Sequence, residues 1–187
     1  LWLMIAWILS SLPRRKPRPS LAAGVLAALA FSSVNADASS LAALLRQRGP
    51  SPEAAHEALE QKDYEKARDL YSKLLESGSL PPATLPELNY ALALAEHQLT
   101  DYDGSVRHFS DALHSGDKRL RTRAHRGLGH TLYDQGSRGL AKQPKITLQR
   151  WMDALKHFDA ALELDPNNKE LRENRELMFE DLSDLRL

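Results

Sequence analysis

Two stretches decide the fold: GLGHTLYDQG at residues 127–136 and WMDALKHFDAALELDPNN at residues 151–168. In the first, Leu128 and Leu132 recur at helical spacing beside the small Gly129. In the second, Ala154 and Phe158 lie four residues apart, and the closing Asp-Pro-Asn-Asn is a strong turn. A small residue lets two helices approach, and an aromatic ring fills the remaining space. The two stretches therefore predict a pair of packed helices.

Upstream, residues 51–82 predict a similar pair. Ser51, before Pro52, can cap a helix over residues 52–61. Asp63 can cap the next helix, whose apolar stripe includes Ala67 and Tyr71. Two prolines at 81–82 then end the pair.

A second pair is predicted over residues 88–113, with Asp101 as the cap of its second helix. The third pair begins near Arg119, and we expect Gly136 to stop its first helix. A last helix over residues 169–186 is apolar on one side and charged on the other, as expected at the end of a stack. Residues 50–187 contain no alternating strand pattern, so the fold class is all-α.

These pairs resemble tetratricopeptide repeats, whose signature is L-G, then A-x3-F, then Pro. The resemblance implies a solenoid of about three helical hairpins with a C-terminal capping helix over residues 51–187. In the second copy Ser105 stands where the signature has Ala. About thirteen extra residues separate Gly136 from Ala154, and an irregular helical bundle is the alternative. The signature positions are Ala67, Tyr71, Phe109, Leu128, Gly129, Ala154, Phe158 and Pro166.

The same two stretches, together with Asn-Arg-Glu at 174–176, also resemble the repeat module of Bat proteins, which come from the bacterial aerotolerance operon. That family usually has Asn where Gly127 and His130 stand here. Its module is periplasmic or membrane-tethered and is sometimes fused behind a von Willebrand type A domain. The resemblance implies a role in assembly more than in chemistry.

Residues 1–38 predict a membrane segment or signal peptide. Residues 1–12 are apolar but shorter than the ~20 residues of a full span. They fit a fragment that begins inside a span, or a chain whose true start is Met4. A basic run, an apolar run at 21–31 and Ala-Asp-Ala at 36–38 follow, in the order of an export signal. Cleavage and retention are both open, and each places the remainder, after a linker at 39–50, outside the cytoplasm of a bacterium.

Composition excludes several classes of function. The chain has no cysteine, so disulfides and thiolate chemistry are impossible. Its 25 basic and 25 acidic residues argue against a dedicated nucleic-acid binder. No catalytic motif is present, and the seven histidines show no ligand spacing. We therefore expect a non-enzymatic protein with no catalytic residue, metal or cofactor.

Binding is the remaining class of function. Arg123, Arg126, His130 and Tyr133 follow spacings of three, four and three, so they share one helical face. Two guanidiniums beside an aromatic ring could hold a carboxylate or an acidic peptide. Asn89 could bind a peptide backbone or bridge two helices. The alternative is a solvated face whose charges pair with the acidic C-terminal helix.

The extra segment at residues 137–150 is the other informative region. Pro144 can begin an elongated helix, and Ile146 and Trp151 add apolar surface. Trp151 either contacts a partner or packs inside its own repeat, and we favour the second interpretation. The predicted function is a scaffold for protein partners in the bacterial envelope, with acidic segments or von Willebrand type A proteins as the candidate partners. The alternatives are a spacer or oligomerisation module of a larger von Willebrand type A membrane protein, and a cell-wall or nucleic-acid factor using the basic residues 118–126.

Overall fold

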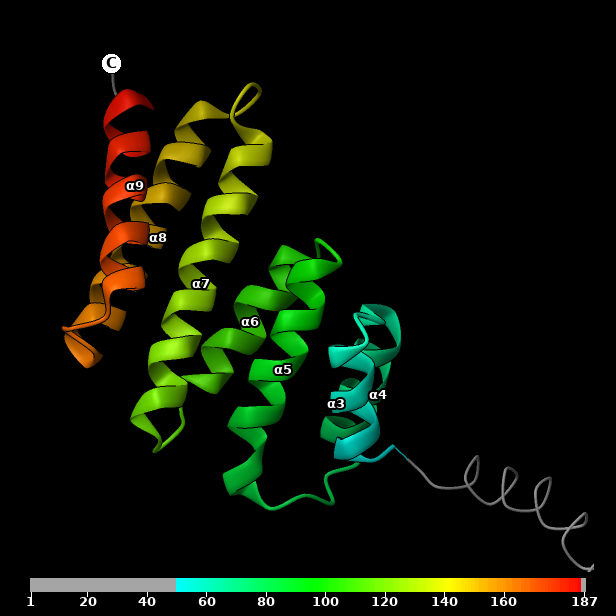
Figure 1. Ribbon diagram of the computed structural model, residues 1–187. Coiled ribbons are helices and arrows are strands. Elements are labelled where there is room, and N and C mark those ends of the chain that lie inside the picture. Colours follow the sequence, from blue (N-terminus) through cyan, green and yellow to red (C-terminus); the bar gives the residue numbers. More distant parts are fainter. Residues whose placement is uncertain (1–49, 186–187) are drawn as a thin grey trace, which may run out of the picture. The chain divides into compact units, whose positions relative to one another are not determined.

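The computed structural model describes residues 50–185, and these form helices and turns without a strand (Figure 1). The all-α prediction is therefore confirmed for this part of the chain. In chain order the elements are α3 (Pro52–Glu60), α4 (Tyr64–Glu76), the 3-10 helix η1 (Pro82–Thr84), α5 (Leu85–Gln98), α6 (Tyr102–Ala112), α7 (Lys118–Gly139), α8 (Pro144–Leu164) and α9 (Lys169–Leu185).

The helix starts follow from short polar side chains. The Ser51 hydroxyl accepts a hydrogen bond from the backbone N–H of Ala54. The carboxylates of Asp63 and Asp101 accept in the same way from the N–H groups three residues on. Each satisfies an N–H that has no partner within its helix. All three predicted caps are confirmed.

The first two pairs close through the same kind of turn. Lys62 and Thr100 take the left-handed conformation, with φ of 60° and 65°, directly before the capping aspartates Asp63 and Asp101. One left-handed residue reverses the chain at a helix C-terminus within a few residues. The turn therefore places α3 against α4 and α5 against α6.

Each helix packs against its neighbour in sequence, from α3 through α9. Contacts also join α3 to α5 and α5 to α7. The odd-numbered helices α3, α5 and α7 thus contact one another in order along the stack. Hydrogen bonds join α9 to α7, so α9 continues this series at the C-terminal end (Figure 1).

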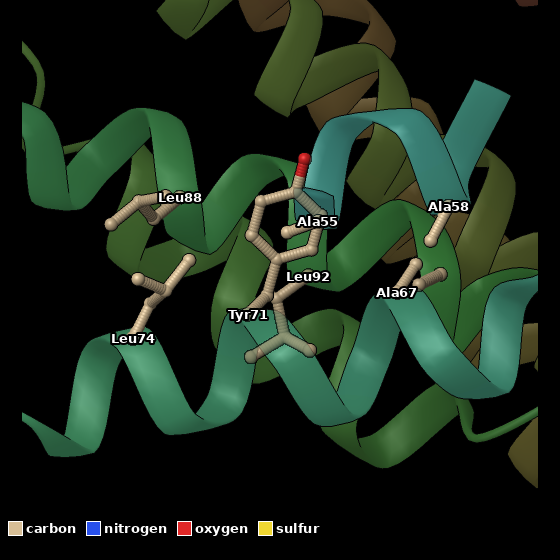
Figure 2. Packing of buried hydrophobic residues seen from close by; sticks show 8 residues of the cluster. Ala55, Ala58, Ala67, Tyr71, Leu74, Leu88 and Leu92 are labelled. Carbon is tan, nitrogen blue, oxygen red and sulfur yellow. The ribbon is translucent and has the colours of Figure 1, made fainter. Parts of the chain in front are cut away.

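Small residues let the first pair pack tightly. Ala55, Ala58 and Ala67 are fully or almost fully buried, and the Tyr71 ring lies between the helices beside Leu92 (Figure 2). Burying a leucine or an aromatic side chain contributes about 1.5–3 kcal/mol. This cluster joins α3 and α4 to α5. Contacts with α5 therefore stabilise the first pair in addition to the contacts between α3 and α4.

Two glycines in α7 admit aromatic rings from the helices on either side. A Cβ on Gly127 would lie 2.5 Å from the ring of Phe109 in α6. A Cβ on Gly129 would lie 2.8 Å from the ring of Phe158 in α8. Both rings are buried. Any side chain at Gly127 would displace Phe109, so the packing requires glycine at this position.

The prediction that Gly136 stops a helix is wrong. The helix α7 continues to Gly139, and Gly136 is buried within it. A Cβ at this position would lie 2.8 Å from the Trp151 ring. Glycine is present here because an aromatic side chain packs on the helix backbone, and this close approach overrides its usual role as a stop signal.

The third pair is longer than the others. Pro144 begins α8, as predicted. Trp151 stacks on Tyr133 with ring centroids 5.0 Å apart and donates its indole N–H to the Tyr133 carbonyl. Trp151 is only 6% exposed. The prediction that Trp151 packs inside its own helix pair is confirmed.

The predicted membrane or signal segment at 1–38 and nearly all of the predicted linker at 39–50 lie outside the described residues. Among residues 50–185, no helix combines the length and the apolar character needed to cross a bilayer.

Candidate binding groove

A row of four pockets runs along α3, α5, α7 and α9. Their volumes are about 430, 360, 380 and 220 Å³. Arg123 lines the first three of these pockets, and Arg126 lines the second and third. His130 lines the second and fourth. Because adjacent pockets share side chains, we treat them as one surface and call it the groove.

The basic pocket of the groove lies between the start of α7 and the α8–α9 turn. Lys118, Arg119, Arg123 and Arg126 line it, together with the single carboxylate of Asp165. An excess of guanidinium and ammonium groups around one cavity favours carboxylate or phosphate ligands. This pocket is the most electropositive part of the groove.

Arg123 connects the basic pocket to an apolar pocket between α3 and α5. Its guanidinium lies 4.8 Å from the centre of the Tyr90 ring and 3.8 Å from the Glu87 carboxylate. The side chains of Arg123 and Glu87 are 46% and 71% exposed, so this ion pair contributes little stability. The guanidinium is therefore held in position over Tyr90 while its remaining N–H groups stay available to a ligand.

The predicted binding face of α7 meets α9. One Arg126 nitrogen lies 3.1 Å from both carboxylate oxygens of Glu170. The Tyr133 hydroxyl donates to Asp181 at 2.7 Å. This is the intramolecular pairing that the alternative interpretation of the face described. Arg126 and Tyr133 thus carry acidic partners from the protein itself, while Arg123 has only an exposed one.

Histidines at the groove are biased toward their neutral forms. Burial, and secondarily the nearby Arg126 charge, lowers the pKa of His130. The His130 ring contacts Phe158 edge-on at 5.2 Å. Burial also lowers the pKa of His97, against an opposing effect of Asp134. At neutral pH the positive charge of the groove therefore comes from its arginines and lysines.

A buried polar layer lies beneath the middle of the groove. The Ser105 hydroxyl donates to the Ala93 carbonyl at 2.9 Å and lies 3.2 Å from the Thr131 hydroxyl. The Nδ1 atom of His97 lies 3.0 Å from the Thr131 hydroxyl. The Ser105 hydroxyl thus joins α5, α6 and α7. Burying these polar atoms without partners would cost free energy, so the layer fixes the register of three helices.

A second buried polar contact joins α5 to α6. Glu96 is only 4% exposed, and its carboxylate lies 2.6 Å from His108. A Cβ on Gly104 would lie 2.9 Å from the Glu96 carboxyl, so glycine makes room for this pair.

The structure places Asn89 apart from the α7 residues. Its side-chain amide donates to the Leu85 carbonyl of its own helix at 3.0 Å. None of the four pockets includes Asn89. The groove thus brings together Arg123, Arg126, His130 and Tyr133 but not Asn89.

The α5 residues that line the groove were not predicted from the sequence, which singled out only Asn89 on this helix for binding. Glu87, Tyr90, Leu94 and His97 line the groove, and each lies 36 positions before one of the four predicted α7 residues. The same offset relates buried Leu92 and Ala93 to Leu128 and Gly129. Copying the α7 face onto the preceding pair at this offset would have identified these positions. Glu170 was missed because its helix was interpreted as a cap.

The described residues give no geometry for catalysis by a metal. Among residues 50–185, no group of three or more histidine or acidic side chains is arranged to hold a metal ion.

A scan against protein-family models finds no matching family, and a search of curated proteins finds no matching relative. The groove itself must therefore support any argument about function.

Proposed function

We propose that this chain is a non-enzymatic protein-interaction scaffold, a tetratricopeptide-type solenoid of about three repeats that binds an acidic protein segment in its groove. The proposal places it on the non-cytoplasmic side of a bacterial membrane, within an envelope assembly of the Bat kind. The observation that carries the binding role is Arg123, which lines three adjoining pockets and has only one weak, exposed ion pair.

Support for the repeat class comes from geometry that recurs along the chain. Phe109 and Phe158 each pack on a glycine of α7. The turns at Lys62 and Thr100 share one conformation. Repeat proteins built from such pairs expose one set of helices along an extended binding surface. The pockets along α3, α5, α7 and α9 follow this arrangement.

Support for an acidic ligand comes from the contacts that α9 already makes. Glu170 places its carboxylate on Arg126, and Asp181 accepts from Tyr133. Both are carboxylates of the protein on the face where the ligand is proposed to lie. An incoming acidic segment would exchange with Glu170 at Arg126 and pair with Arg123 directly.

Support for the location comes from the sequence of residues 1–38, in which basic and apolar runs precede Ala-Asp-Ala in the order of an export signal.

The test uses fluorescence anisotropy to measure the binding of a short, fluorescein-labelled, glutamate-rich peptide to the full chain. Arg123→Glu is expected to weaken binding about tenfold or more, since a charge-assisted hydrogen bond is worth about 1.5–3 kcal/mol. Lys66→Glu on α4 makes the same charge change at an exposed site away from the groove and is the matched control. Equal affinities for the wild type and Arg123→Glu contradict the proposal.

A second arm uses the internal competitor. Glu170→Gln removes the carboxylate paired with Arg126 and is expected to tighten binding a few-fold, in line with about 0–1 kcal/mol for an exposed ion pair. In cell envelopes, crosslinking of the wild type should capture a protein that Arg123→Glu with Arg126→Glu does not. Capture that survives both charge reversals would assign the interaction to another surface.

A further inference from the structure

We propose that the tip of the α7–α8 pair is a docking surface for an anionic phospholipid bilayer. We define the hairpin tip as residues 138–150, which connect and extend the two helices (Figure 1). This surface is separate from the groove and does not depend on its ligand.

The hairpin tip projects because both helices are elongated. The residue of α6 that packs on α7 is Phe109, seven residues after the start of α6, whereas Phe158 lies fourteen residues after the start of α8. Seven additional helical residues correspond to about 10 Å. The pair α5–α6 shows that a tight turn is sufficient to join such helices. The extension is therefore not needed to close the pair.

The charge of the hairpin tip has one sign. It contains Arg138, Lys142, Lys145 and Arg150, and no acidic residue occurs between Asp134 and Asp153. Asp134 and Asp153 are themselves paired, with His97 and with Lys156. Within residues 50–185, no ion pair involves any of the four cations.

Apolar side chains are exposed among these cations. Residues 140–146 form an unbroken exposed run. Leu140 and Ile146 are 38% and 46% exposed, and they are two of the four large hydrophobic residues exposed in the described chain. Lysine beside exposed aliphatic residues matches the boundary of a bilayer, where acyl chains meet anionic headgroups.

The hairpin tip is held in a fixed conformation. The Thr147 hydroxyl is buried and donates to the Gly136 carbonyl at 2.7 Å. The backbone N–H of Gln143 donates to the Gly139 carbonyl, also at 2.7 Å. Arg138 lies over the Tyr102 ring of α6 at 5.0 Å. Because these contacts order the hairpin tip before it binds, the entropic cost of docking is lower.

A soluble acidic protein or a nucleic acid would also satisfy the charge. The exposed aliphatic residues at the end of the hairpin favour the bilayer, because insertion of Leu140 and Ile146 requires an apolar layer beneath the charged surface. Electrostatic attraction is about 1 kcal/mol for each lysine or arginine near an anionic membrane, or about fivefold in affinity.

The experiment exploits the absence of cysteine in the chain. Ala141→Cys in the full chain, labelled with the environment-sensitive dye NBD, reports contact of the hairpin tip with lipid. Asn167→Cys, exposed in the turn at the other end of α8, is the control label. The probes are vesicles of phosphatidylcholine alone and of phosphatidylcholine with phosphatidylglycerol. Attachment through residues 1–38 would bring both labels to the vesicles, but only direct contact shifts the emission of a label.

We expect emission at position 141, and not at 167, to shift to shorter wavelength with the anionic vesicles only. Lys142→Gln with Lys145→Gln should raise the lipid concentration at half-maximal shift about thirty-fold. Lys66→Gln with Lys73→Gln on α4 is the matched control and should leave it unchanged. Leu140→Ser with Ile146→Ser should reduce the shift itself.

Three results would overturn the proposal. The first is no shift at position 141 with anionic vesicles. The second is an equal shift with phosphatidylcholine alone or in the lysine variant. The third is the same shift with soluble polyglutamate or duplex DNA in place of vesicles, which assigns the hairpin tip to an acidic macromolecule. Circular dichroism of each variant verifies that the helices are retained.

Discussion

The pairs α5–α6 and α7–α8 pack through the same kinds of residue at two positions but differ in the rest of their interfaces. Both place a small residue, Ala93 or Gly129, at positions related by 36 residues, and both bury a phenylalanine. The α5–α6 interface contains a buried polar contact near its turn, Glu96 against His108. The α7–α8 interface is aromatic, with Trp151 stacked on Tyr133. The small residue and the ring are shared, whereas the turn and the rest of the interior vary.

This difference separates what holds a pair together from what a pair can be used for. The tight turn at Thr100 gives α5–α6 no long connection, so the functional surface of this pair is the side of α5 that lines the groove. The long connection of α7–α8 exposes cations and aliphatic residues at no cost to the buried aromatic cluster. Variation among helix pairs is therefore where functional surfaces should be sought in this chain.

The largest expected effect is loss of a shared phenylalanine. Phe158→Ala and Phe109→Ala each remove a fully buried ring, and each is expected to lower the free energy of unfolding by about 3–5 kcal/mol. Chemical denaturation followed by circular dichroism measures this. A cost below about 1 kcal/mol for either variant would show that its ring does not anchor the pair.

Adding one methyl group should have the next largest effect. Gly129→Ala places a Cβ 2.8 Å from the Phe158 ring and is expected to destabilise by about 1–3 kcal/mol. Gly139→Ala is the matched control, because its Cβ would meet only Thr147, at an ordinary 3.6 Å. Alanine at 139 should be neutral or stabilising by up to about 1 kcal/mol, as in an ordinary helix. Equal costs for the two variants contradict close packing at Gly129.

Acid should weaken the α7–α8 pair through two histidines that face each other. The His125 and His157 Nδ1 atoms lie 3.1 Å apart across this interface. Burial and the neighbouring His125 lower the pKa of His157 to about 4, and burial with Arg121 lowers the pKa of His125. The folded state thus binds fewer protons than the unfolded chain, whose histidines titrate near 6.5. This stabilisation is complete above pH 6.5 and is lost as the pH falls toward 4.

The size of the acid effect is about 1 kcal/mol, because both rings are partly exposed and solvent screens them. Denaturation curves between pH 7 and 4 measure it. His157→Gln should flatten the dependence, while His56→Gln, at an exposed position of α3, should not. An unchanged dependence in His157→Gln would remove this pair as its origin.

The smallest effect is a gain in the tight turn of α5–α6. Thr100 is β-branched, yet it has φ of 65°, a conformation that favours glycine. Thr100→Gly is expected to raise the melting temperature and to stabilise by about 1 kcal/mol. Thr122→Gly, within α7, should instead destabilise by a few tenths of a kcal/mol, because glycine has a lower helix propensity than threonine. Loss of stability in Thr100→Gly would mean that the threonine side chain contributes more than its backbone strain costs.

Local patterns in the sequence predicted the helices and three of their caps. Short polar residues before apolar stripes predicted Ser51, Asp63 and Asp101 as caps, because capping depends on atoms only a few residues apart. Gly136 was misinterpreted because its role depends on Trp151, fifteen positions later. A glycine that ends a helix and a glycine that receives a ring look alike in sequence.

The candidate site was predictable only on one helix. Helical spacing placed Arg123, Arg126, His130 and Tyr133 on one face of α7, and the structure places all four at the groove. Periodicity within one helix does not reveal what lies opposite. Tyr90 beneath Arg123 and Glu170 beside Arg126 are set by how the helices stack, and that arrangement requires three dimensions.

The most direct test of the central claim is amide chemical-shift mapping of the full chain during titration with the glutamate-rich peptide. The proposed groove predicts that the perturbed residues lie on α5, α7 and α9 around Arg123, with α4 and α6 silent. It also predicts that in Arg123→Glu these changes require about tenfold more peptide or are lost. Perturbations confined to α4 and α6, or none at saturating peptide, would contradict the account.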